Sequence, residues 1–169
     1  MKYNPQKHNR RSIRLKGYDY TKAGSYFVTI CVNNRLCLFG EIIEYEMNLN
    51  DAGKMVKKIW QGIPQYYPNF DVDFYIVMPN HFHGIILMFK ENDVGASHCG
   101  RPFNSGQTQW SDPTKRLSLG DMIGRFKSYT THEYLNGVKN FYWEPFYKKL
   151  WQRNYYEHIH PVRYMKTFE

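Results

Sequence analysis

The fold follows from one stretch, Val72-Asp-Phe-Tyr-Ile-Val-Met-Pro-Asn-His-Phe-His-Gly-Ile-Ile-Leu-Met-Phe89. From Val72 to Met78 the residues alternate with the period of a strand, and Val72, Phe74, Ile76 and Met78 are expected to form a well-buried face. An apolar run begins again at His81, after Pro79 and Asn80. A two-residue connection of this kind predicts an antiparallel hairpin.

His81 and His83 open the second strand of this hairpin. Side chains two residues apart on a strand share a face, so both imidazoles are expected to project together while Phe82 points to the opposite side. A neutral imidazole is a good metal ligand, and two on a rigid strand form half of a metal site. The alternative is a pair of surface histidines on an edge strand.

The other elements follow from periodicity and from cap signals. Residues 25–33 are β-branched and aromatic, which predicts a strand, and residues 36–46 favour one or two more short strands. Asn50 and Asp51 are expected to begin a helix with Met55, Ile59 and Ile63 on its apolar side, ended by Pro64 and Pro68. Residues 91–114 are rich in Gly, Ser, Asn, Gln and Pro, which predicts a long flexible loop, in which His98 and Cys99 are taken as incidental.

A second helix is expected from about Ser118. Leu119, Met122, Ile123 and Phe126 recur at core spacing, whereas Arg125, Lys127 and His132 are expected to be exposed. Residues 142–151 favour a loop and a short strand. The order of strand, helix, hairpin and helix predicts an α+β fold, an antiparallel ferredoxin-like or RRM-like sheet with helices packed on one face.

Length and composition bound the class of protein. At 169 residues the chain is expected to form one domain, residues 1–169. It has no apolar run long enough for a membrane span and no hydrophobic signal region at its start, so a cytoplasmic protein without a membrane partner is expected. Three cysteines without zinc-type spacing (Cys31, Cys37 and Cys99) are expected to be reduced.

Charge and aromatic content point to a polyanionic partner. The chain carries 23 Lys and Arg against 15 Asp and Glu, and 18% of its residues are aromatic. Cations that contact phosphates and rings that stack on unpaired bases suit nucleic acid, although a solvated basic surface over a tyrosine-rich core is the alternative. Basic residues concentrate in a predicted N-terminal arm at about residues 1–20 and again near the C-terminal end.

Five segments together resemble a known family. They are Arg10-Arg-Ser-Ile-Arg-Leu-Lys-Gly-Tyr-Asp-Tyr20, Tyr26-Phe-Val-Thr-Ile-Cys31, Val77-Met-Pro-Asn-His-Phe-His-Gly84, Gly124-Arg-Phe-Lys-Ser-Tyr129 and Leu150-Trp-Gln-Arg-Asn-Tyr-Tyr-Glu-His-Ile159. In this order they resemble the REP-associated tyrosine transposases, IS200-like single-tyrosine enzymes of the HUH endonuclease superfamily. The match spans nearly the whole chain.

The resemblance implies a nuclease that cuts and rejoins single-stranded DNA beside hairpin repeats. It implies that His81 and His83 bind one divalent metal ion, Mg²⁺ or Mn²⁺, which polarises the scissile phosphate while a tyrosine oxygen attacks it. The product is a 5′-phosphotyrosine and a free 3′-hydroxyl. The partner it implies is single-stranded or hairpin DNA, and we expect contacts from Arg10, Arg11, Arg14, Lys16, Lys127 and Arg153.

The chain departs from the family where the nucleophile is expected. Relatives carry a C-terminal helix with a Tyr-Ile-x-x-Asn-Pro pattern, whereas here the Tyr-Tyr-Glu-His-Ile element leads into His160-Pro-Val-Arg163 and a shortened tail. One interpretation is that Tyr156 is the nucleophile and His160, four residues on, the third metal ligand, as on one face of a helix. Tyr164 and Tyr129 are weaker candidates.

The alternative is a catalytically inactive relative that binds hairpin DNA after losing the tyrosine helix. A third interpretation is an RNA-binding module, which has no need of a metal-facing histidine pair. Members of this superfamily also form dimers that exchange the tyrosine helix. A homodimer is therefore one expected assembly, although a short tail makes the exchange harder.

Overall fold

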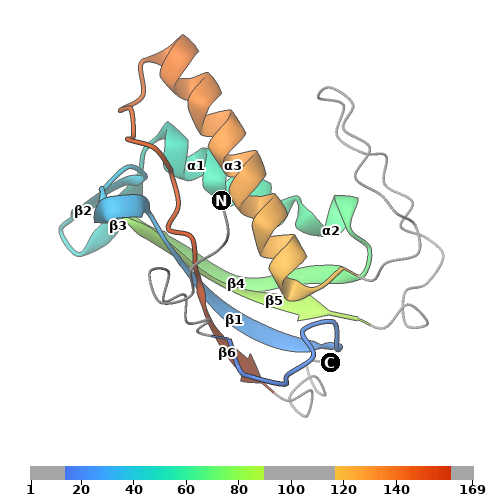
Figure 1. The fold of residues 1–169 in the computed structure, drawn as a ribbon. Helices are drawn as coiled ribbons and strands as arrows, with labels where there is room; N and C mark the ends of the chain where they lie inside the picture. Colours follow the sequence, from blue (N-terminus) through green and yellow to red (C-terminus); the bar gives the residue numbers. More distant parts are fainter. Residues whose placement is uncertain (1–13, 90–116, 161–169) are drawn as a thin grey trace, which may run out of the picture.

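The computed structural model describes residues 14–89 and 117–160. Its main sheet has four antiparallel strands in the order β4-β5-β1-β6. These strands are β1 (Gly24–Cys31), β4 (Phe70–Met78), β5 (His81–Met88) and β6 (Tyr156–His160). Two helices, α1 (Asp51–Gln61) and α3 (Leu119–Phe141), cover one face of this sheet (Figure 1). The expected α+β fold, with an antiparallel sheet and helices on one face, is confirmed.

The hairpin that the sequence predicts is present, and its turn is tied to the rest of the sheet. Met78 pairs with His81, so Pro79 and Asn80 form the two-residue connection. The carbonyls of both turn residues accept backbone hydrogen bonds, Pro79 from Phe39 at 3.1 Å and Asn80 from Val32 at 2.9 Å. The start of β5 is therefore fixed on two sides.

Side-chain caps begin both long helices, and the cap of the first was predicted. The Asn50 side chain accepts a hydrogen bond from the Gly53 amide at 2.9 Å and caps α1. Ser118 and Asp121 form a reciprocal capping box at the start of α3. Pro64 does not end α1, because α1 ends at Gln61 with Gly62 as its C-cap, and Pro64 lies in the first turn of a separate short helix, α2 (Ile63–Tyr66).

The core lies between the helices and the inner face of the sheet. Trp60 of α1 lies at its centre, with its ring 4.6 Å from that of Phe82 on β5 and 5.3 Å from that of Phe126 on α3. All three rings are buried. Each side chain of this size contributes about 1.5–3 kcal/mol to stability on burial. The inner face of α1 consists of Ala52, Gly53, Val56 and Trp60, whereas the predicted Met55 and Ile59 are only half-buried at its margin.

The predicted buried face of β4 is wrong for Phe74, Ile76 and Met78, of which Ile76 and Met78 pair with His83 and His81. The pairing with β5 shifts between Val72 and Tyr75, which is a bulge. Because an extra residue reverses the side-chain alternation, Tyr75 and Val77 pack toward the core, while Phe74 and Ile76 are 80% and 47% exposed on the opposite face.

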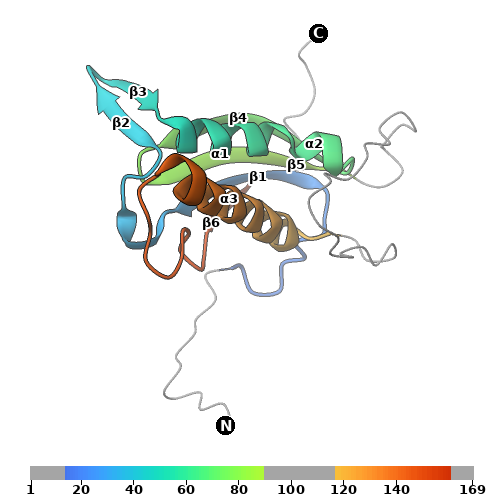
Figure 2. The same ribbon diagram turned by 90° about the horizontal axis from the view of Figure 1, so that it is seen from above.

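A second, two-stranded sheet projects from the end of the main one. It consists of β2 (Gly40–Ile43), which lies in the predicted region 36–46, and β3 (Glu46–Leu49), which begins at the end of that region and extends beyond it. Seen from above, the two helices lie over the main sheet and the small hairpin extends beyond them (Figure 2). Among the described residues, the face of the main sheet opposite the helices has no helix over it. We call this face the open face.

Candidate functional site

The histidine pair lies on the open face at the start of β5. His81 and His83 are half-buried, and the Phe82 side chain between them is fully buried on the opposite side against Trp60. The His81 and His83 rings are 4.7 Å apart, centroid to centroid, and nearly perpendicular to each other. The sequence prediction of two imidazoles on one face is confirmed.

Each ring is oriented by a hydrogen bond to its Nδ1 atom. The Nδ1 of His81 lies 2.7 Å from Oδ1 of Asn80, an oxygen that can only accept, so the ring nitrogen donates. The Nδ1 of His83 lies 2.8 Å from the hydroxyl of Thr29 on β1. A proton on Nδ1 leaves the Nε2 lone pair of His81 for a metal ion, and His83 has the same free lone pair when its Nδ1 donates to the Thr29 hydroxyl; partners of this kind orient metal-binding histidines.

The surroundings keep both rings neutral. Burial lowers the pKa of His81 below its ordinary value of 6.5. Burial also lowers the pKa of His83, and the neighbouring His81 adds to the effect. Because only the neutral imidazole has a lone pair to share, the rings are ready as ligands at neutral pH. The pair therefore fits two positions of a metal coordination sphere.

No third ligand accompanies the pair among residues 14–89 and 117–160. In that part of the chain, no group of three or more His, Cys, Asp or Glu side chains has metal-binding geometry. A complete site would need further ligands from water, substrate or residues beyond those described.

Tyr156 lies on the open face in the same row as His83. The register pairs Tyr156 with Thr29, and Thr29 with His83, so the three residues follow one another across β6, β1 and β5. Neighbouring strands are about 4.8 Å apart, which puts the Cα atoms of Tyr156 and His83 roughly 10 Å apart. The Tyr156 side chain is 58% exposed. A phosphate bound at the histidine pair would thus lie within reach of the tyrosine hydroxyl.

The helical arrangement expected for Tyr156 and His160 is wrong, because both residues belong to strand β6. The backbone of His160 pairs with Ser25, which is opposite Leu87 rather than the histidines. At roughly 3.4 Å per residue, this position is roughly 14 Å along the sheet from the row of His83, in addition to two strand spacings. This separation of the backbones is too large for His160 to share a metal ion with the pair in this arrangement.

Two of the residues predicted to contact DNA make hydrogen bonds within the protein. The guanidinium of Arg14 donates to the Tyr155 hydroxyl at 2.9 Å and lies over the rings of Tyr20 and Tyr155. Lys127, which the sequence predicts to be exposed, is half-buried and contacts the chain before β6. Lys16 and Arg153 are exposed, whereas Arg10 and Arg11 lie outside the described residues, as do the predicted loop 91–114 and Tyr164.

Sequence reasoning missed Asn80 and Thr29 as partners of the histidines. Asn80 had a signal, since an amide side chain directly precedes His81 in the turn. Thr29 had none, because its contact with His83 depends on the pairing of β1 with β5.

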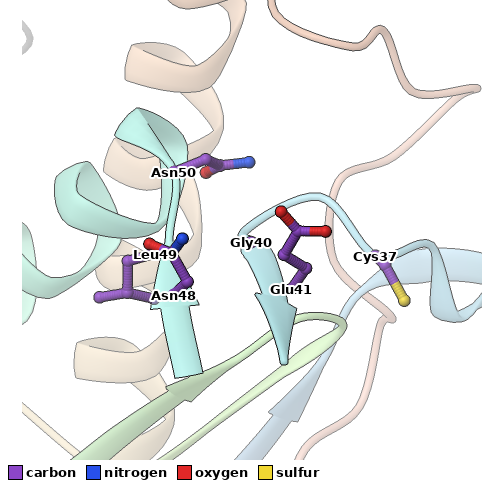
Figure 3. A pocket seen from close by; sticks show the side chains of 6 residues that line it. All are labelled: Cys37, Gly40, Glu41, Asn48, Leu49 and Asn50. Atoms are coloured by element: carbon purple, nitrogen blue, oxygen red, sulfur yellow. The ribbon is translucent and has the colours of Figure 1, made fainter. Parts of the chain in front are cut away.

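A pocket elsewhere in the protein is not part of this site. It lies at the base of the small hairpin and is lined by Cys37, Gly40, Glu41, Asn48, Leu49 and Asn50 (Figure 3). Glu41 is the single charged residue in its lining, and neither histidine of the pair contributes to it. Within the described ranges, the helices are all too short or too polar to pass through a lipid bilayer.

Comparison of sequences places the chain in a family. It is 41% identical over 158 residues to an uncharacterized protein of Haemophilus influenzae, and the match covers 94% of this chain and 82% of that protein. The chain belongs to the same family as this protein. No family model matches the chain, so membership of the family by itself assigns no function.

Two solved structures resemble the chain at low identity, and both concern transposases. One is a REP-associated tyrosine transposase bound to a REP hairpin, with a TM-score of 0.47 and 17% identity over 87% of this chain. This chain spans 62% of that protein, which is less than two thirds of its length. The other, from Deinococcus radiodurans, is described as a candidate transposase, with a TM-score of 0.46 and 14% identity, covering 87% of this chain and 85% of that one.

Proposed function

We propose that this chain is a transposase of the single-tyrosine type that cuts and rejoins single-stranded DNA next to hairpins. The observation that carries the proposal is the histidine pair, two neutral rings side by side on the open face with each Nδ1 engaged. Tyr156 in the row of His83 and the basic, aromatic-rich composition support it. A divalent metal ion, Mg²⁺ or Mn²⁺, is the proposed cofactor.

In this proposal, His81 and His83 bind the metal ion through Nε2, while Asn80 and Thr29 fix the orientation of the rings. When bound, the metal ion supplies positive charge that polarises the scissile phosphate. The hydroxyl of Tyr156 releases its proton to solvent as its oxygen forms a bond to phosphorus, and the bond from phosphorus to the 3′ oxygen breaks as that oxygen takes up a proton. The 3′ oxygen leaves as a hydroxyl, and the 5′ end stays on the tyrosine. The reverse attack by a 3′-hydroxyl rejoins the strand without a high-energy cofactor.

The test is a covalent-adduct assay on a denaturing gel. A hairpin oligonucleotide with a single-stranded flank, labelled on the 3′ side of the cleavage position, is incubated with the protein and Mn²⁺. Label is expected to run with the protein, and to be lost in Tyr156→Phe and in His81→Ala/His83→Ala. Tyr142→Phe, which removes a hydroxyl from a tyrosine that is 94% exposed at the end of α3, is the matched control and should keep the adduct.

The second candidate is a protein that binds hairpin DNA without cutting it. It is favoured by β6, since the Tyr-Tyr-Glu-His-Ile element is a strand here and the expected helical pairing of Tyr156 with His160 is not formed. This candidate predicts a retarded band on a native gel, with no adduct and no nick at any Mn²⁺ concentration. A nick that survives in the His81→Ala/His83→Ala protein would exclude the proposed site.

A further inference from the structure

We propose that Lys127 is a positioning residue that fixes the register of β6, so that Tyr156 rather than Tyr155 stands on the open face beside the histidine pair. The part of this inference that concerns catalysis rests on the proposed function. The part that concerns the register does not, because it is carried by contacts within the chain.

Lys127 of α3 closes the turn that leads into β6. Its Nζ atom donates to the carbonyl oxygens of Gln152 at 2.9 Å, Arg153 at 3.3 Å and Asn154 at 3.1 Å. An ammonium group has three donors, so three consecutive carbonyls use all of them. The contacts fix the path of the backbone over the three residues that immediately precede Tyr155.

The same segment is attached on either side of this turn. The indole of Trp151 donates to the hydroxyl of the buried Thr130 at 2.8 Å, one helical turn after Lys127 on α3. The backbone N–H of Gln152 donates to the backbone carbonyl of Cys31, at the end of β1, at 2.9 Å. The chain therefore enters β6 between α3 and β1 with its position along both of them defined.

Register decides which of two adjacent tyrosines reaches the open face. Tyr155 is 7% exposed and lies under Arg14 and Lys127, whose charged groups are 5.2 and 5.5 Å from its ring centre. Tyr156, the next residue, is 58% exposed and faces the other way. Since side chains alternate along a strand, a slip of one residue would exchange their faces. Because both residues are tyrosines, what holds the strand sets their faces, and this is the pairing of β6 with β1 together with the turn that Lys127 binds.

Placing the Lys127 ammonium group in this half-buried position costs desolvation free energy, which packing of its side chain alone would not require. Burial lowers its pKa to about 8, opposed by the nearby Cys31 thiol and reinforced by the positive charge of Arg14. A partly desolvated charge is tolerated where it is hydrogen-bonded, as the half-buried Lys127 is to three carbonyls. An apolar side chain of similar length would pack here at less cost but would leave three carbonyls without their donor.

Tyrosine reactivity tests the register without any DNA. The free protein is treated with N-acetylimidazole, and acetylation of Tyr155 and Tyr156 is mapped by mass spectrometry in the wild type, in Lys127→Met and in Lys139→Met. Lys139 lies on the same helix and is exposed, so its variant removes the same charge without touching the turn. Tyr26 and Tyr134, at 0% and 1% exposure, must stay unreactive and report that the core is intact.

In the wild type and in Lys139→Met, Tyr156 should react and Tyr155 should not. Loss of charged hydrogen bonds in Lys127→Met is expected to lower the ratio of Tyr156 to Tyr155 acetylation by about tenfold or more. An unchanged ratio would overturn the proposal. Should Tyr26 or Tyr134 react in Lys127→Met, the comparison passes to Lys127→Arg, whose planar fork keeps the charge but cannot direct three donors from one atom. There too an intermediate ratio supports the proposal, and a wild-type ratio overturns it.

Nicking kinetics then test the consequence for catalysis. In Lys127→Met, kcat for hairpin DNA is expected to fall about tenfold with KM nearly unchanged, because the tyrosine is displaced but the DNA contacts are not. A rise in KM at constant kcat would mean that Lys127 binds DNA instead. If the wild type forms no adduct while Lys127→Met still shifts the acetylation ratio, the proposed function fails and the role of Lys127 in the register stands.

Discussion

At the scale of single residues, the histidine pair owes its geometry to two unlike neighbours. Asn80 belongs to the same hairpin as His81, so that contact forms whenever the turn forms. Thr29 lies on β1, so His83 is oriented only when β1 and β5 are paired in register. The His81 ring is thus positioned locally and the His83 ring by the assembled sheet, which makes Thr29 the more informative residue to change.

Thr29→Val is expected to weaken binding of Mn²⁺ to the free protein by about 10–100-fold, because valine keeps the shape of threonine but gives the His83 Nδ1 no partner. Titration calorimetry or the Mn²⁺ electron paramagnetic resonance signal would measure the change. Thr131→Val, which removes a hydroxyl that donates to the Lys127 carbonyl within α3, is the control and should bind like the wild type. Equal affinities in the two variants would show that Thr29 does not orient a ligand.

Acid should release the metal ion at a pH lower than ordinary histidines would dictate. Protonation removes the Nε2 lone pair, and burial lowers the pKa of both rings below 6.5, so both rings are available as ligands at neutral pH and binding declines as the pH falls. Mn²⁺ binding followed from pH 7.5 downward should therefore reach half its value below 6.5. A midpoint above 6.5 would mean that the rings are not desolvated, or that other groups bind the metal.

At the scale of the elements, sequence patterns predicted the strands and helices better than the faces they present. The periods that identify β5 and α3 are local, and the cap at Asn50 was visible as a residue type. The bulge in β4 was not visible, because its cause is the pairing with β5, and it turned Phe74 and Ile76 to the open face. A single extra residue in a strand is enough to move the following side chains to the opposite face, even where the period of the strand is predicted correctly.

Gly84 shows how closely β5 packs against α1. A Cβ atom added there would lie 2.5 Å from the Trp60 ring and 2.8 Å from the Phe82 ring, both buried in the core. Gly84→Ala is therefore expected to lower the free energy of unfolding by about 1–3 kcal/mol, measured by urea denaturation. Gly124→Ala is the contrasting control, since its Cβ meets nothing within 4 Å on an exposed helix position. It should stabilise the protein by about 0.5–1 kcal/mol. A neutral Gly84→Ala would mean that the Trp60 ring can shift.

At the scale of the whole molecule, the two faces of the main sheet have different roles, since one face forms the core and the other carries the candidate site. Its inner face packs against aromatic and aliphatic residues of α1 and α3, while its open face carries the histidine pair and Tyr156. The pair was predictable from two residues on one strand. The relation of Tyr156 to that pair was not, because it depends on three strands in register and on a turn bound by Lys127 from a helix. The prediction treated the four-residue spacing of Tyr156 and His160 as helical and so placed both residues on one face of a helix. In the structure both belong to a strand, and His160 lies far from the row of His83.

The same division predicts that DNA affinity and cleavage respond to different substitutions. Arg10 and Arg11 belong to the predicted basic arm and are expected to contact phosphates. The DNA-binding constant falls as salt rises, and each lost phosphate contact makes the slope of log K against log salt concentration less steep by about 1. Arg10→Ala/Arg11→Ala should therefore reduce that slope for hairpin DNA by about 2 in a filter-binding titration. His81→Ala/His83→Ala should leave the slope unchanged while abolishing the adduct.

Lys57→Ala/Lys139→Ala gives this experiment its charge-matched control. Both lysines are exposed on the helices that cover the inner face, so the variant loses the same net charge on the side of the sheet away from the histidine pair. If salt dependence reflected net charge alone, the two double variants would behave alike. A slope that falls only in the arginine variant would locate phosphate binding in the arm, whereas an equal fall in both would remove the arm from the DNA-binding surface.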